Sequence, residues 1–147
     1  MQNISGFGLT VSILASNTFP VGLLLNVWPD DQDALSFPDA EIADGAVGVN
    51  GDLIVWSKGA AIRCALSTIP DSAPDLQLAL LLAANRVGKN KVGAKDIMQM
   101  AVVQGNNNLG TFTNGIILSG PPFNGVASSG RMKTKTYNFM FEAYYAV

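Results

Sequence analysis

The residues of this chain that could do chemistry are carboxylates, most of which lie in its first half. Asp30, Asp31 and Asp33 offer the oxygen ligands that Ca²⁺ prefers. However, no Gly follows them at the required spacing, and no Glu closes a twelve-residue loop. The cluster therefore does not predict a calcium site.

Two other kinds of catalytic chemistry can be weighed in the same way. Asp39, Glu41 and Asp44 could supply paired carboxylates for glycoside hydrolysis, but the sequence predicts no cleft to hold them. The chain contains no His, so Ser and Cys nucleophiles lack their usual base. Cys64 is the only Cys and is expected to be a small core residue. We therefore expect a protein that is not an enzyme and has no metal or cofactor.

The composition predicts one domain, residues 1–147, since a chain of this length can bury about 70% of its unfolded surface. Hydrophobic residues make up 48% of the chain and charged residues only 14%. Residues 1–29 carry no charged side chain, so they lack the basic region of a signal peptide. Ser12 and Asn17 interrupt the apolar run that a membrane-spanning helix needs, and we expect no membrane insertion.

The charges are divided unevenly along the chain. Residues 1–75 hold nine acidic and two basic residues, whereas residues 76–147 hold seven basic and two acidic ones. Opposite patches of this kind suit head-to-tail association of identical copies; the alternative is that both sets are scattered over the surface. Residues 97–130 carry no charge, and we expect part of them to be buried in neighbouring subunits.

The central stretch, Ala46–Asn85, predicts three strands followed by a helix. Asn50-Gly51 between two apolar runs indicates a hairpin with a type I′ turn. Lys58-Gly59 would form a second tight reversal, so that Ala46–Thr68 becomes a three-stranded meander.

A helix is predicted over about residues 72–86. Ser72 can cap it, and Asp75 lies three residues later, as in a capping box. Its main apolar stripe consists of Leu76, Leu80, Ala83 and Ala84, and three more leucines widen that stripe. Most of the helix circumference should therefore be covered by protein.

Further strands are predicted at Phe7–Ala15, Val21–Trp28, Asp96–Gln104, Thr111–Ser119 and Arg131–Tyr145. The second is an apolar run broken only by Asn26, and it should be covered on both faces. One face of the last carries basic and then mainly aromatic residues: Arg131, Lys133, Lys135, Tyr137, Phe139, Phe141, Ala143 and Tyr145. Such a face is typical of a strand that starts in solvent or at an interface and ends in the core; the alternative is a nucleic-acid platform.

Pro29–Asp39 is an acidic loop that contains two apolar residues, Leu35 and Phe37, with no obvious core to reach. Apolar residues on an exposed loop favour docking onto another subunit. The alternative is that the loop folds back over its own domain.

The order of these elements resembles the tail tube proteins of long-tailed bacteriophages, in particular those with contractile tails. The resemblance covers Phe7–Ala143. It rests on Val49-Asn50-Gly51-Asp52-Leu53, the Lys58-Gly59 turn, the Ala-Ile-Arg-Cys-Ala-Leu strand and Ser67–Ser72 at the start of a Leu-rich helix. The run Asn106–Asn108 and the long uncharged amino terminus depart from the family pattern.

The resemblance implies a mainly β fold, an antiparallel β-sandwich or barrel of about seven strands with one flanking α-helix. It also implies a structural virion protein in the tail, assembled in the host cytoplasm. Six copies would form a ring, and stacked rings would form the channel that delivers DNA to the host. Its partners would be further copies of itself and the tail sheath, baseplate hub and tail terminator proteins. The tape measure protein and DNA would pass through without specific binding.

Two sets of residues are expected to carry this role. A channel for DNA should be polar or acidic, because each lysine–phosphate contact would hold the DNA. The candidates for its lining are Asn26, Asp44, Gln99, Thr111 and Thr113. The candidates for contacts between subunits or rings are Asp30, Asp31, Asp33, Leu35, Phe37, Asp39, Lys89, Lys91, Arg131, Lys133 and Lys135.

Two alternatives remain at this point. One is the inner tube ring of a type VI-like secretion system, which is similar to phage tubes in fold. The other is a monomeric β-barrel that binds a ligand in its interior.

Overall fold

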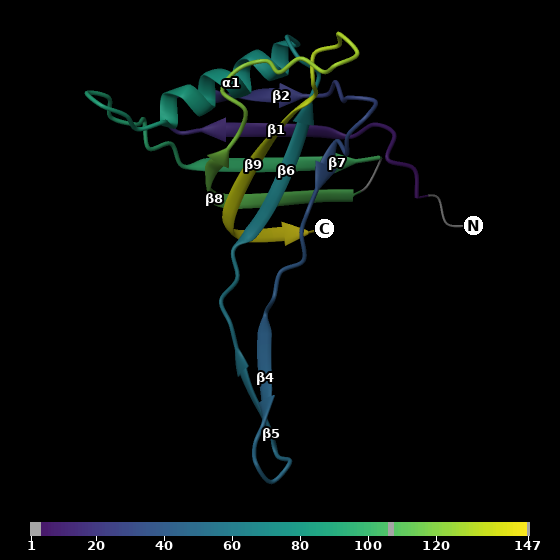
Figure 1. Cartoon of the computed structure of the whole chain (residues 1–147), viewed down its shortest axis with the longest axis vertical. Helices are drawn as coiled ribbons and strands as arrows, with labels where there is room; N and C mark the ends of the chain where they lie inside the picture. Colours follow the sequence, from purple (N-terminus) through teal and green to yellow (C-terminus); the bar gives the residue numbers. More distant parts are fainter. Residues whose placement is uncertain (1–3, 106–107, 147) are drawn as a thin grey trace.

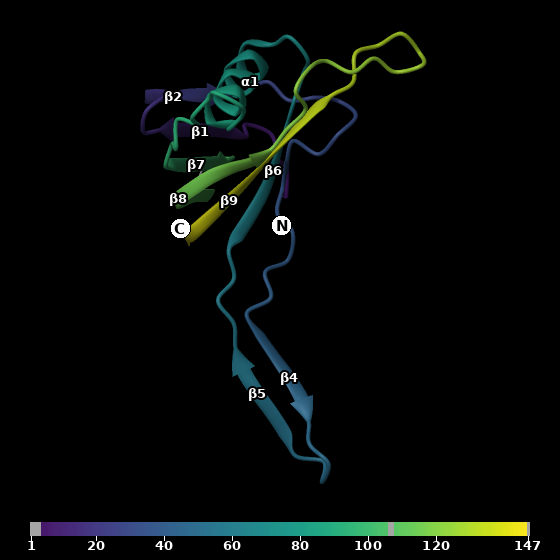
Figure 2. The same ribbon diagram turned by 60° about the vertical axis from the view of Figure 1, so that its left-hand side comes forward.

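The structure is a computed structural model that describes residues 4–105 and 108–146, and its fold is mainly β (Figure 1). Seven strands form one antiparallel sheet, in the order β2 (Phe19–Leu25), β1 (Thr10–Ala15), β7 (Met98–Gln104), β8 (Asn108–Ser119), β9 (Lys135–Ala146), β6 (Ile62–Thr68) and β3 (Leu35–Ser36). The sheet curls into a half-barrel, and one helix, α1 (Ala73–Asn85), packs against it (Figures 1 and 2). This confirms the predicted fold class.

The core lies between α1 and one face of the sheet. On β1, Val11, Ile13 and Ala15 are fully buried and alternate with more exposed residues, as expected for a strand with one covered face. Cys64 on β6 is also buried, as predicted. The predicted strands at residues 96–104 and 111–119 are confirmed as β7 and β8, while Asn106 and Asn107 of the asparagine run lie outside the described residues.

Helix α1 begins as predicted but presents a different face to the sheet. The Ser72 side chain caps it by accepting a hydrogen bond from the Asp75 backbone N–H, at 3.4 Å. Leu78 and Leu81 are fully buried, whereas Leu76 and Leu80 are more than half exposed. The prediction that protein covers most of the helix circumference is therefore wrong, because α1 packs through Leu78 and Leu81 and leaves Leu76 and Leu80 exposed.

The predicted meander over residues 46–68 is also wrong. The hairpin at Asn50-Gly51 forms, from β4 (Ala43–Val47) and β5 (Leu53–Ser57), but β5 does not pair with β6. The chain continues past Lys58-Gly59 without reversing and enters the large sheet (Figure 1). Gly51 alone has a positive φ in the turn, of 88°, so the turn is not type I′.

The second predicted strand is covered on one face only. Leu23 and Leu25 of β2 are buried, but Leu24 is 53% exposed and Val21 is 93% exposed. An apolar run cannot distinguish a strand buried on both faces from an edge strand, and β2 is an edge of the sheet.

The buried face of β9 changes sides near its end. Phe141 lies on the core side, over Gly115, where an added Cβ would come within 2.2 Å of its ring. Further along, the exposed Tyr144 pairs with buried Phe112 and stacks on it at 6.1 Å, so Ala143 lies on the opposite face. Asn114, at a φ of 54°, sits in a β-bulge of β8 at this point. The prediction that Ala143 and Tyr145 share the Phe141 face is therefore wrong.

A buried carboxylate joins the helix to the sheet. Asp75 has no exposed surface, and its oxygens accept hydrogen bonds from Thr68 Oγ1 at 3.1 Å and Tyr137 Oη at 3.0 Å. It also pairs with Lys135 Nζ at 3.2 Å and accepts from the Asp71 N–H at 3.0 Å. Burial, together with the Asp75 charge, raises the pKa of Tyr137, so its hydroxyl stays a donor.

The burial of Lys135 leads to the first prediction. Lys135→Met would leave Asp75 as an unpaired buried charge and should lower the free energy of unfolding by about 3–5 kcal/mol. Urea unfolding followed by circular dichroism measures this loss. The matched control is Lys133→Met, two residues earlier and exposed, which should cost little. Equal losses in the two variants would contradict this account of the ion pair.

A second carboxylate, Asp96, ties the β1–β2 turn to the end of α1. It accepts hydrogen bonds from the backbone N–H groups of Asn17 at 2.7 Å and Thr18 at 2.9 Å. The Thr18 hydroxyl and Asn85 Nδ2 also donate to it. Burial pushes the pKa of Asp96 up, but these donors outweigh burial and hold the pKa below its usual value.

Asp96→Asn should therefore destabilise the protein in a pH-dependent way. The amide has one acceptor oxygen and turns its own N–H groups toward donors, which costs about 1–3 kcal/mol for each donor left unsatisfied. Because the folded pKa of Asp96 is lowered, its contribution is complete above the unfolded value of about 4 and is lost as the pH falls further. The difference from wild type should thus shrink below pH 4 in urea unfolding curves. A difference that does not change with pH would refute this.

Candidate assembly interface

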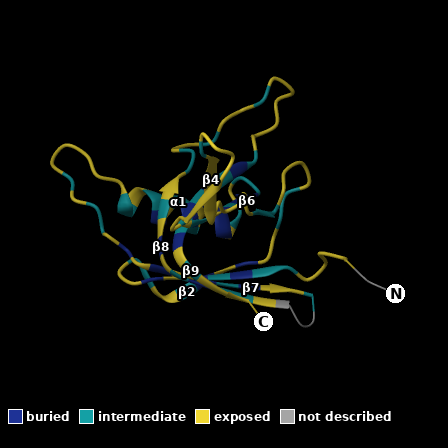
Figure 3. Cartoon of the chain, turned by 90° about the horizontal axis from the view of Figure 1, so that it is seen from below, coloured by how far each residue is buried: buried dark blue, intermediate teal, exposed yellow. Residues whose placement is uncertain are grey.

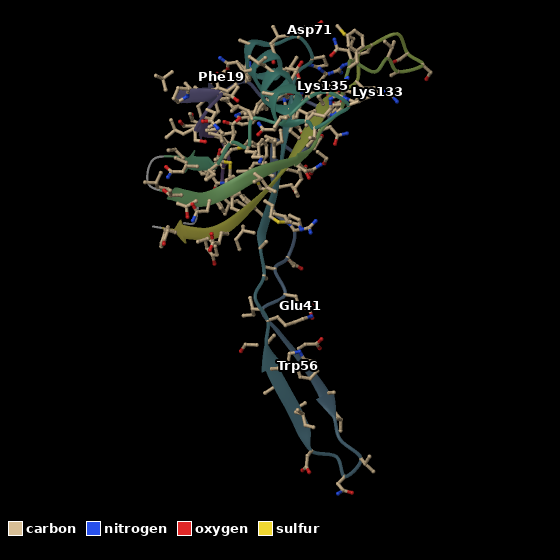
Figure 4. The ribbon with its side chains drawn as sticks, turned by 90° about the vertical axis from the view of Figure 1, so that its left-hand side faces the viewer. Phe19, Glu41, Trp56, Asp71, Lys133 and Lys135 are labelled. Carbon is tan, nitrogen blue, oxygen red and sulfur yellow. The ribbon has the colours of Figure 1, made fainter. Side chains whose placement is uncertain are left out.

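The hairpin of β4 and β5, residues 43–57, projects away from the sheet, and we call it the arm (Figures 1 and 2). Every residue of both strands is exposed (Figure 3). Trp56, the largest side chain on the arm, is 47% exposed and lies well away from the body (Figure 4). The arm therefore contributes nothing to the core.

The arm is apolar on both of its faces. Cross-strand pairing places Val47 beside Leu53 and Gly45 beside Val55 on one face, and Ala46 beside Ile54 on the other. Its larger apolar residues are Val47, Val49, Leu53, Ile54, Val55 and Trp56, which range from 47% to fully exposed. A two-stranded hairpin alone is marginal in water, and exposed apolar patches mark interaction sites. The arm thus needs a surface that this chain does not provide.

The foot of the arm is held by local polar contacts. Lys58 Nζ lies 3.2 Å from Glu41 Oε1 and 3.5 Å from Asp44 Oδ2, and its backbone N–H donates to Ile42 O at 2.9 Å. Exposed pairs of this kind contribute little to stability. The contacts keep the two legs together, and they pair two of the carboxylates considered for glycoside chemistry with a lysine rather than with each other.

The second candidate surface is the part of the sheet face turned away from α1 that lies on β1, β2, β7 and early β8, and we call this part the open face. The residues of the same face on β9 and β6, among them Glu142 and Arg63, are not included in it. It is made by the β1, β2, β7 and early β8 residues that alternate with the core, and none of them is charged. They are Thr10, Ser12, Leu14, Leu24, Gln99, Ala101, Val103, Leu109, Thr111 and Thr113. The predicted channel residues Gln99, Thr111 and Thr113 therefore come together here.

The other two predicted channel residues are placed differently. Asn26 is exposed and lies just beyond the end of β2, in step with Leu24 of the open face. Asp44 lies on the arm, paired with Trp56, and is not part of the open face. Sequence alternation identified neighbours on one sheet, but it could not show that Asp44 belongs to a separate hairpin.

The acidic loop folds back over its own sheet. Leu35 pairs with Leu66 in β3, and the Phe37 ring stacks on that of Phe112 at 5.2 Å. Asp30 Oδ1 lies 2.6 Å from Arg131 Nη2, and the Arg131 hydrogen bond lowers the pKa of Asp30. The interpretation that Leu35 and Phe37 lack a core to reach is therefore wrong, because β3 and Phe112 receive them.

The remaining contact candidates fall into three groups. Asp33, Asp39, Lys89 and Lys133 are exposed, and a contact with another subunit stays a prediction for them. Asp31 accepts from the Thr134 hydroxyl, and Lys91 Nζ donates to Ala83 O at the end of α1. Lys135 must be removed from the set, because it is buried against Asp75 and cannot reach a neighbour (Figure 4).

Sequence reasoning missed the arm as a functional element. The signal was present in Leu53-Ile54-Val55-Trp56, four consecutive apolar residues in a hairpin strand, where a strand with one solvent face would alternate. The described residues contain no group of three His, Cys, Asp or Glu side chains that could hold a metal. Within the same residues, no helix combines the length and the hydropathy needed to cross a membrane.

Comparison with known proteins places the chain in a family. The family model described as "Tail fiber protein gp32" matches residues 2–145. The chain belongs to the tail fiber protein gp32 family. It is therefore a phage-tail-like protein, which agrees with the coarse part of the resemblance found in the sequence. No curated protein matches the chain.

Solved structures similar to this gp32-family chain come from contractile injection systems. A sheath/tube terminator of the extracellular contractile injection system PVC has a TM-score of 0.62 at 9% identity, covering 100% of this chain and 98% of that one. The tube terminating cap of the anti-feeding prophage has a TM-score of 0.61 at 12% identity, and the match covers 100% of this chain and 92% of that one. A chain of the PVC sheath–tube complex has a TM-score of 0.56 at 13% identity, and the match covers 99% of this chain and 91% of that one. At these identities the likeness establishes a common fold.

The exposure of the arm predicts that it can be removed from the gp32-family fold. Replacing residues 43–57 by a Gly-Asn-Gly turn should leave the melting temperature of the sheet almost unchanged, because Ile42 and Lys58 already meet through a hydrogen bond. The same variant should lose self-association, measured by size-exclusion chromatography. An unfolded variant, or one that associates normally, would contradict the assignment of the arm as an assembly element.

Proposed function

We propose that this protein is a structural ring subunit of a phage-type tail tube. Six copies form a ring, stacked rings form a tube, and the tube conducts DNA passively to the host. The subunit performs no catalysis and uses no cofactor.

The observation that carries the proposal is the arm. Its two apolar faces have no cover among the residues that the structure describes, so a second molecule would provide it. A protein built from many identical copies supplies that cover at every position of the assembly.

Ring closure would use the edges of the sheet. One edge is β2, with seven residues, and the other is the short β3 beside β6. Such edges invite pairing with another chain, and a closed barrel removes them. In the proposed ring, β2 of one subunit therefore lies beside the β6–β3 edge of the next.

The open face would line the channel. It presents Gln99, Thr111 and Thr113 but no charged side chain, so it offers DNA phosphates no fixed partner. Asn26 lies at the margin of this face, whereas Asp44 would belong to contacts between rings. A neutral polar lining allows DNA and the tape measure protein to slide.

The proposed tube would also contact other proteins of the tail. The similar chains are named as parts of a sheath/tube terminator, a tube terminating cap and a sheath–tube complex. By analogy, the sheath, the baseplate hub and the tail terminator are the proteins that this tube would meet in the virion tail, after assembly in the host cytoplasm.

A second candidate is a terminator ring that closes the end of a tube. It is supported by the similar structures named for a sheath/tube terminator and a tube terminating cap, which have TM-scores of 0.62 and 0.61. A terminator forms one ring, whereas a tube protein stacks without limit, so the two candidates differ in the length of the assembly.

Negative-stain electron microscopy of the purified protein distinguishes the candidates. We expect hexameric rings that stack into hollow tubes, and isolated rings would indicate the terminator instead. The assembled tubes should not shift DNA in a gel at physiological salt, because the open face is uncharged. A protein that remains monomeric at high concentration would overturn both, and would favour the ligand-binding barrel.

A further inference from the structure

The outward side of α1 is an apolar stripe that none of the described residues covers. Leu76 and Leu80 are 58% and 57% exposed, and Val87, just past the helix, is 72% exposed. Ala73 and Ala83, also exposed, complete a series at helical spacing, and we call these five residues the outer stripe. It contains no charged residue.

The outer stripe and the arm lie at opposite ends of the molecule. In Figures 1, 2 and 4, which share one vertical axis, α1 stands at the end from which the arm points away. The arm of a subunit therefore cannot reach its own α1. In a head-to-tail stack, however, the arm of one copy points toward the α1 end of the next.

The two surfaces also match in length. Each arm strand has five residues, about 17 Å at the usual rise of a strand. Helix α1 has 13 residues, about 20 Å at the usual rise of a helix. The two elements are therefore of similar size, and because α1 runs across the direction of the arm in Figure 1, an arm that enters along the stacking direction crosses the outer stripe.

Charge complementarity gives the orientation. Residues 86–95, directly after α1, hold four basic residues and no acidic one: Arg86, Lys89, Lys91 and Lys95. Asp52 is exposed at the tip of the arm, and the foot adds Glu41 and Asp44 against the single Lys58. An arm that crosses α1 near its carboxyl end (Figure 1) brings Asp52 toward the basic segment.

We propose that the arm of one copy docks across the outer stripe of the copy in the next ring, near the carboxyl end of α1 (Figure 1), with Asp52 toward residues 86–95. The arm face that meets Leu76 and Leu80 carries Val47, Leu53 and Val55, because the other face carries the charged Asp44. This inference rests on the proposed stacking of identical rings. Beyond that stacking, it identifies the outer stripe as the surface that covers the arm.

Cysteine cross-linking between two differently tagged chains tests the docking. One chain carries Val55→Cys on the arm and the other Leu80→Cys on the outer stripe, both at exposed positions that should not disturb folding. Native Cys64 can remain, because burial raises the pKa of its thiol to about 12 and hides it from a bis-maleimide. The two chains are mixed, assembled into tubes and treated with a short bis-maleimide. The control replaces Leu80→Cys by Val103→Cys, on the open face.

We expect a cross-linked dimer of the two tagged chains in the first mixture and none in the control. Tubes that form without this dimer, or that give the same dimer yield with Val103→Cys, would overturn the docking while leaving the proposed tube intact. If wild type and variants all fail to form rings, the proposed function fails first, and this inference fails with it.

Discussion

The buried carboxylate of Asp75 is the contact on which the arrangement of helix and sheet depends. It receives the end of β6 through Thr68, the start of β9 through Lys135 and Tyr137, and the turn before α1 through the Asp71 N–H. A charge without exposed surface is tolerated only when every lone pair has a partner. These contacts therefore fix where α1 begins, which way it runs over the sheet, and which of its sides is left outward.

That outward side and the arm share one physical problem. Both are apolar and exposed, and within residues 4–105 and 108–146 neither is covered by another segment. The sheet itself has a well-filled core between its inner face and α1, so the two surfaces are additions to a fold that is already complete. Surfaces of this kind are favourable only in an assembly, where the free energy of covering them drives association. A structural subunit in a tail, with its neighbours always present, can keep such surfaces.

Much of the fold could be predicted from the sequence because it rests on local patterns. Alternation over β1 and β7, the capping residue Ser72 and the Asn50-Gly51 hairpin all depend on neighbours a few residues apart. The errors arose where long-range contacts decide. From the sequence, Leu35 and Phe37 had no core to reach, but in the structure Leu35 pairs with Leu66 of β6 and Phe37 stacks on Phe112. The candidate channel residues were also chosen from local patterns. Gln99, Thr111 and Thr113 lie on one face of the large sheet, but Asp44 lies on the separate arm.

The sequence by itself determined that the chain is mainly β with one helix, that it has no His, and that it carries more apolar surface than its few charges suit. These follow from composition and periodicity, which are properties of the chain alone. Only the tertiary structure decided that the excess is concentrated on an arm at one end and a helix stripe at the other. Periodicity shows that an element has an apolar face, but only the packing of segments that are distant in the sequence shows whether the same chain covers that face.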